Sequence, residues 1–123
     1  MLAVILLLAC GPPPAAPPLA PVAVGDQVAM RLTEASLVRQ SGDLEAAVAA
    51  WEDAHAAFES ELEGRLRIRC GDRCTTELEY GFARLRQALE TDDRDAVAIA
   101  DELGLRIQDA ASTLPEIEPE ADP

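Results

Sequence analysis

The stretch Leu44-Glu-Ala-Ala-Val-Ala-Ala-Trp51-Glu-Asp-Ala-His55-Ala-Ala-Phe58-Glu-Ser-Glu-Leu62 has the clearest periodicity in this 123-residue chain. Its bulkier side chains recur at alternating steps of four and three residues, which places them on one face of an α-helix. They are Leu44, Val48, Trp51, His55, Phe58 and Leu62. The spacing predicts a helix over residues 44–66, with this stripe as the seam that packs against other helices.

Three further segments show the same periodicity and predict three more helices. Their apolar stripes are Val28, Leu32 and Ala35, widened by Met30, Leu37 and Val38, in residues 26–40; Leu78, Phe82, Leu85 and Leu89 after Cys74; and Ala96, Ile99, Leu103, Ile107, Ala110 and Leu114 before Pro115. Thr76 and Glu79 match a capping box, which predicts that the third helix begins there. Turn residues at Gly42-Asp43 and Asp92-Asp93 separate the other helices. The pattern predicts an all-α, up-down-up-down four-helix bundle made of two helical hairpins.

The composition fits such a bundle and excludes some partners. The chain is rich in alanine and has only four aromatic residues, a composition that favours closely packed helices over strands. Its net charge is −13, from 23 acidic residues against ten arginines. A surface of this charge repels phosphate groups, so we expect no nucleic-acid partner.

The amino terminus carries an apolar run, Leu2 to Ala9, that ends in Leu7-Leu8-Ala9-Cys10-Gly11. This arrangement resembles the lipobox of bacterial lipoproteins, with an aliphatic residue three before the cysteine, a small residue before it and glycine after it. The resemblance implies export, lipidation of Cys10 and cleavage before it. Gly11, in place of aspartate, resembles the pattern of lipoproteins that reach the outer membrane. We therefore expect a lipid-anchored cell-envelope protein that faces the periplasm. The alternative is a buried N-terminal strand or helix with a thiol at its end.

The predicted organisation follows from these features. Residues 1–9 are a signal peptide, and residues 10–24 are the lipidated cysteine and a Pro/Ala-rich linker that favours extended polyproline II. Residues 25–114 form the helical domain. Residues 115–123 are an acidic, proline-punctuated tail that we expect to be disordered.

A second resemblance covers residues 35–54. Gly42-Asp-Leu-Glu-Ala-Ala47-Val-Ala-Ala-Trp51-Glu-Asp-Ala54 looks like the turn and second helix of a tetratricopeptide repeat. The small residue, the aromatic residue and the alanine of that family fall at Ala47, Trp51 and Ala54. The chain departs from the family at Arg31 and Glu34, where bulky apolar residues are expected. The resemblance implies a helical hairpin in the style of such a repeat.

Two groups of residues are candidates for a structural or binding role near the middle of the chain. Cys70 and Cys74 flank a Gly-Asp-Arg turn, and in an exported chain we expect them to form a disulfide. The alternatives are a redox-active pair and a soft-metal site. Basic residues gather beside them and could dock an anionic partner, although basic side chains at a helix C-terminus also complement its dipole. These residues are Arg65, Arg67, Arg69 and Arg73.

His55 is the single histidine and occupies the apolar seam of residues 44–66. It is expected to be a partly buried residue hydrogen-bonded to a neighbouring helix. The alternative is a metal ligand, with Glu52 three residues before it and Glu59 four after it. The sequence has no Ser-His-Asp set in a plausible context and no phosphate-binding glycine loop. We therefore expect no enzyme and no cofactor, but an envelope lipoprotein with a helical scaffold domain that binds an envelope protein. The alternative function is a periplasmic bundle that binds a metal or small ligand through His55 and nearby carboxylates.

Overall fold

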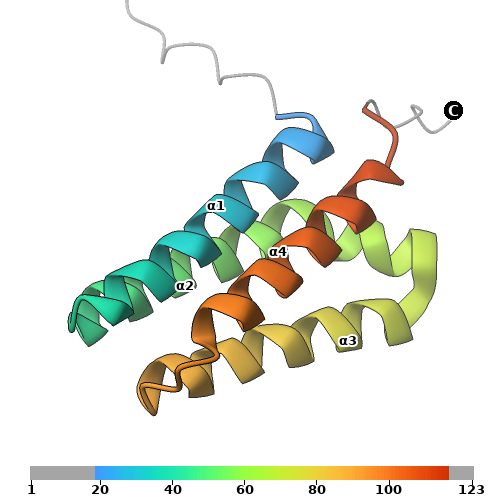
Figure 1. Cartoon of the computed structure of the whole chain (residues 1–123). Coiled ribbons are helices and arrows are strands. Elements are labelled where there is room, and N and C mark those ends of the chain that lie inside the picture. Colours follow the sequence, from blue (N-terminus) through green and yellow to red (C-terminus); the bar gives the residue numbers. More distant parts are fainter. Residues whose placement is uncertain (1–18, 117–123) are drawn as a thin grey trace, which may run out of the picture.

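Helices account for nearly all of residues 19–116, the part of the chain that the computed structural model describes. They are α1 (Pro21–Gln40), α2 (Leu44–Phe58), the π-helix η1 (Glu59–Glu63), α3 (Gly64–Glu90) and α4 (Ala96–Ser112) (Figure 1). The described residues contain no strand, so the predicted all-α class is confirmed. The expected signal peptide, Cys10 and most of the linker and tail lie outside the described residues.

The helices form two antiparallel hairpins, α1 with α2 and α3 with α4 (Figure 1). The two hairpins meet where α1 lies along α4. The chain passes from α2 through η1 into α3 without leaving helical structure, apart from a sharp bend at Gly71 (φ 85°, ψ 175°). If the bend at Gly71 is counted as a break, the described residues form the four helices that were predicted. If the helical structure from Leu44 to Glu90 is counted as one, they form three.

The turns after α1 and α3 have the same geometry. After α1, the Asp43 N–H donates to Val38 O (3.3 Å) and the Gly42 N–H to Arg39 O (2.9 Å), the two bonds of a Schellman motif. After α3, the equivalent bonds join Asp93 N to Ala88 O (2.9 Å) and Asp92 N to Leu89 O (3.4 Å). Gly42 (φ 94°) and Asp92 (φ 53°) hold the left-handed position of each motif. The two hairpins therefore close by one mechanism.

The first helix begins earlier than the sequence predicted. It starts at Pro21, within the expected polyproline linker, and not near Asp26. A proline is tolerated in the first turn of a helix because the N–H that it lacks would have no intrahelical partner there. Burial of the Pro21 and Val24 side chains against the bundle favours this extension. Residues 21–24 thus belong to the first helix and not to the linker.

The core face of the first part of α2 differs from the predicted seam by about one residue, whereas Phe58 and Leu62 are buried as predicted. Its fully buried residues are Ala47, Ala50, Ala54 and Phe58. Leu44 is exposed, and Trp51 and His55 are only half-buried, next to Phe82 of α3. Alanines let α1 lie close to α2, whereas larger side chains would hold the two helices apart. On α1, the predicted Val28, Leu32 and Ala35 are buried, but Met30 and Leu37 are exposed.

The core continues from α2 through the π-helical turn η1 into α3. Phe58, Leu62 and Leu66 follow one another at steps of four residues, and all three are at most 1% exposed. In a regular α-helix each step of four rotates the side chain by about 40°, because a turn takes 3.6 residues, and such steps still fall on one broad face. The wider turn of η1 takes more residues, which reduces this rotation and aligns the three side chains more closely.

The predicted start of the third helix is wrong. Thr76 lies within α3 and is exposed, and no capping box forms there. Helical structure resumes directly after Gly71, where the buried Thr75 hydroxyl donates to Asp72 O (3.0 Å). The Glu79 side chain, expected to cap this helix, instead contacts His55. The apolar stripe Leu78, Phe82, Leu85 and Leu89 is buried as predicted.

Candidate functional site

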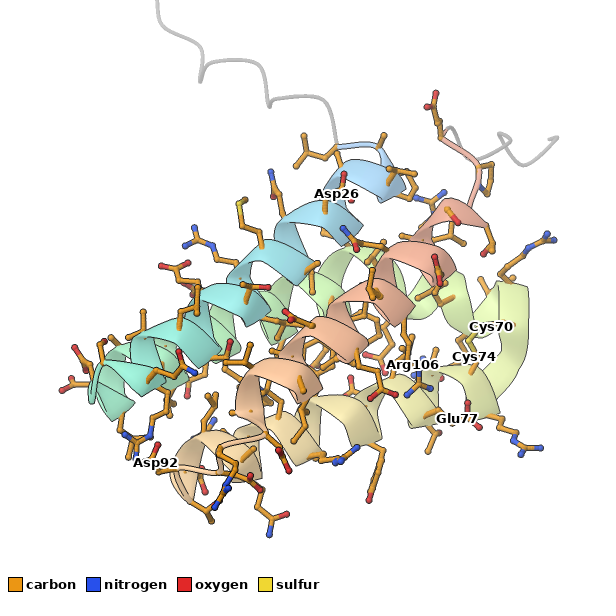
Figure 2. All side chains as sticks on the ribbon, viewed as in Figure 1. Asp26, Cys70, Cys74, Glu77, Asp92 and Arg106 are labelled. Atoms are coloured by element: carbon orange, nitrogen blue, oxygen red, sulfur yellow. A yellow bond between two sulfur atoms is a disulfide. The ribbon has the colours of Figure 1, made fainter. Side chains whose placement is uncertain are left out.

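The bend at Gly71 is closed by a bond between Cys70 and Cys74. Their sulfur atoms are bonded, and their Cα atoms lie 5.7 Å apart (Figure 2). The pair stands at the end of the bundle where the chain reverses from α2 and η1 into the long part of α3. A disulfide across so short a loop stabilises by about 2 kcal/mol in the chain-entropy account. Its position indicates a structural role, to fix the angle of the bend.

The arginines beside this bend mostly contact their own chain. Arg67 pairs with Glu63 (3.0 Å) and Asp72 (3.3 Å), and Arg73 pairs with Glu77 (3.3 Å). Arg65 donates to Pro115 O (2.6 Å), which ties the segment after α4 to the first turn of α3. Arg69 is exposed and makes no ion pair with residues 19–116. The four residues therefore surround one end of the molecule, but they do not form a single patch of unpaired charge.

Glu77 connects this end of the molecule to α4. Besides Arg73, its carboxylate faces Arg106 of α4 at 3.7 Å, and the two labelled side chains lie near one another in Figure 2. Such exposed ion pairs contribute little to stability, because water screens the charges. They do reduce the positive charge that the arginines present to a partner.

His55 lies between two carboxylates. Its Nδ1 is 2.9 Å from Glu59 Oε1 on the next turn, and its Nε2 is 2.7 Å from Glu79 Oε2 on α3. Trp51 stacks on the ring with a centroid distance of 4.8 Å, and Phe82 packs beside it at the same distance. The sequence pointed to Glu59, which is four residues away, but not to Glu79, which only the pairing of α2 with α3 brings close.

Glu52, the other carboxylate considered from the sequence, belongs to a different group of contacts. It faces Arg86 at 3.7 Å. The Arg86 guanidinium lies over the Trp51 ring at 5.0 Å, and the Trp51 indole N–H donates to Phe82 O (2.9 Å). These contacts join α2 to α3 and leave Glu52 out of the histidine cluster.

A groove between α1 and α4 was not predicted from the sequence. It has a volume of about 450 Å³ and is lined by Asp26, Ala29, Met30, Thr33, Asp101, Gly104, Leu105 and Gln108. The helices approach closely at its floor, where a Cβ atom on Gly104 would be 3.1 Å from Ala29 Cβ. Met30 (64% exposed) and Leu105 (62% exposed) stand at its two sides. Asp26, labelled in Figure 2, accepts a hydrogen bond from the Gln108 side chain across the groove (3.0 Å).

The groove combines exposed apolar side chains with negative charge. Its lining includes Asp26 and Asp101 but no basic residue. Sequence reasoning placed Met30 in the core because it counted every apolar residue near the stripe. The signal that could have located the groove is the pairing of small residues, Ala29 and Gly104, at which two helices can approach closely.

Comparison of the chain with protein-family models, curated proteins and solved structures finds no match in any of the three. Cys10 and the lipobox-like segment lie outside the described residues. Within residues 19–116, no helix has the length and apolar character needed to cross a membrane.

Proposed function

We propose that this chain is a lipid-anchored protein of a bacterial cell envelope whose helical domain binds another envelope protein and does not catalyse a reaction. The anchor rests on the resemblance of Leu7-Leu8-Ala9-Cys10-Gly11 to a lipobox. Lipid on Cys10, followed by a proline-rich segment, would hold the domain at a distance from the bilayer. The outer membrane, facing the periplasm, is the proposed location because glycine and not aspartate follows Cys10.

The observation that supports binding is the α1–α4 groove with Met30 and Leu105 exposed at its sides. Large apolar side chains on both sides of a concave surface are typical of a recognition surface for protein segments. The two lining aspartates, in a chain of net charge −13, favour a partner segment in which basic residues flank an apolar one. The partner proposed here is therefore a basic amphipathic segment of an envelope protein.

Photo-crosslinking in intact cells tests this proposal. A photoreactive residue at position 30 should crosslink one envelope protein, whereas the same residue at exposed Ala83 on α3 should not. Leu105→Glu, which adds a charge to the groove, should abolish the adduct while the protein remains in the membrane fraction. Equal crosslinking from positions 30 and 83, or an adduct that survives Leu105→Glu, would contradict the groove as the binding surface.

A further inference from the structure

The cluster of His55, Glu59 and Glu79 places a carboxylate oxygen beside each nitrogen of one imidazole ring. One potential ligand atom from each residue lies within 4.8 Å of the others. A neutral imidazole has a single N–H, so it can donate to only one of the two carboxylates that face its nitrogens. At the other nitrogen, two lone pairs would then face each other across less than 3 Å. Either a second proton or a metal ion must lie on that side of the ring.

We propose that this cluster binds a divalent first-row transition-metal ion, Cu²⁺ or Zn²⁺, through His55 Nε2 and the Glu79 carboxylate. This inference is independent of the proposed partner groove, because the cluster lies between α2, η1 and α3. Two carboxylates beside a neutral imidazole give the site a formal charge of −2, which a divalent cation neutralises. Imidazole is a good ligand for both ions, and carboxylate oxygen binds them in mixed sites.

The distances and exposures assign the ion to the Nε2 side. Bonds of about 2.0–2.2 Å from the ion to nitrogen and oxygen place these atoms about 3.4 Å apart in a tetrahedral site, so the two side chains, now 2.7 Å apart, would have to separate to admit the ion. Glu79 is the less exposed of the two carboxylates and comes from a different helix, so the ion would link α2 to α3. Glu59 would accept the Nδ1–H, which fixes the tautomer and orientation of the ring, as carboxylates do beside metal-bound histidines.

The single tryptophan of the chain provides a direct measurement, because Trp51 stacks on the His55 ring. Cu²⁺ quenches indole fluorescence at short range. The full-length chain with Cys10→Ser, which removes a competing thiol, should show saturable quenching by one Cu²⁺ per chain. Zn²⁺, which does not quench in this way, should restore the fluorescence by competition and should raise the melting temperature. Quenching that never saturates, or that Zn²⁺ leaves unchanged, would overturn the proposal.

Three substitutions and one control assign the ligands. His55→Gln and Glu79→Gln should each abolish saturable quenching, and Glu59→Gln should weaken binding by about 10–100-fold as the loss of an orienting partner. Glu52→Gln removes a carboxylate charge as Glu79→Gln does, on the helix that carries His55, and should leave binding unaltered, because Glu52 faces Arg86. Circular dichroism verifies that each variant keeps its fold. Full binding by folded His55→Gln or Glu79→Gln, or equal loss in Glu52→Gln, would overturn the assignment.

Discussion

At the scale of single residues, Gly71 determines where the chain reverses between α2 and the long part of α3. Its backbone (φ 85°, ψ 175°) lies in a region that is open almost exclusively to glycine. Beyond the two neighbouring residues, no atom lies within 4 Å of the position that a Cβ would take, so the requirement comes from the backbone and not from crowding. The disulfide between the residue before Gly71 and the third residue after it then holds this conformation.

Gly71→Ala should lower the free energy of unfolding by about 1–3 kcal/mol, the cost of a side chain in this backbone region. Gly64→Ala is the matched control, since Gly64 has helical angles (φ −60°, ψ −41°) and open space around it. This second substitution should raise stability by roughly 0.5–1 kcal/mol. Urea unfolding with the disulfide intact measures both. Equal effects of the two substitutions would contradict a special role of Gly71.

At the scale of the helix, α2 uses two neighbouring faces for different purposes. The alanine face, Ala47, Ala50 and Ala54, is buried in the core, and α1 is the helix against which α2 mainly packs. The adjoining face holds Trp51 and His55 against α3, where hydrogen bonds and ring contacts replace deep burial. Trp51 and His55 therefore lie half-buried at the edge of the core.

The alanine face predicts a contrast between two substitutions on one helix. Ala54→Leu should cost about 1–3 kcal/mol, because a fully buried alanine leaves no room for a larger side chain. Ala56→Leu, two residues away and exposed, should change stability by less than about 0.5 kcal/mol. Chemical denaturation of the two variants beside the parent measures the difference. A stable Ala54→Leu variant would show that α1 and α2 can move apart at little cost.

The helices themselves could be predicted from periodicity, and the stripes of α3 and α4 are buried as expected, apart from the half-buried Ala110. The packing face of α2 could not be predicted, because a search for hydrophobic periodicity favours large apolar residues over alanine. The π-turn of η1 and the contact between His55 and Glu79 depend on how neighbouring helices meet, which the spacing within one helix does not encode. Glu59 could be identified from the sequence because it follows His55 by four residues.

At the scale of the whole molecule, the bundle is held by its core and by a few links between helices. Arg39 at the end of α1 donates to Leu89 O at the end of α3 (2.7 Å), which joins the two hairpins at one end. The disulfide and Arg65 hold the other end. Because the apolar core runs the length of the bundle between them, we expect the fold to survive the loss of either link.

Reduction of the Cys70–Cys74 bond should lower the melting temperature by roughly 8–16 °C, as about 2 kcal/mol of stabilisation is removed from a domain of this size. The helical circular dichroism at 25 °C should persist, because the buried apolar faces remain. The Cys70→Ala, Cys74→Ala double variant should melt like the reduced parent. Loss of the helical signal on reduction would mean that the disulfide, and not the core, maintains the fold.

The central claim, a lipid-anchored envelope protein, is tested most directly by intact-mass analysis of the protein extracted from the membrane fraction of its own cells. We predict a chain that begins at Cys10 and carries acyl groups on that residue. Its Cys10→Ser variant should remain unlipidated and leave the membrane fraction. A membrane-fraction chain that still contains residues 1–9 and an unmodified Cys10 would contradict the account.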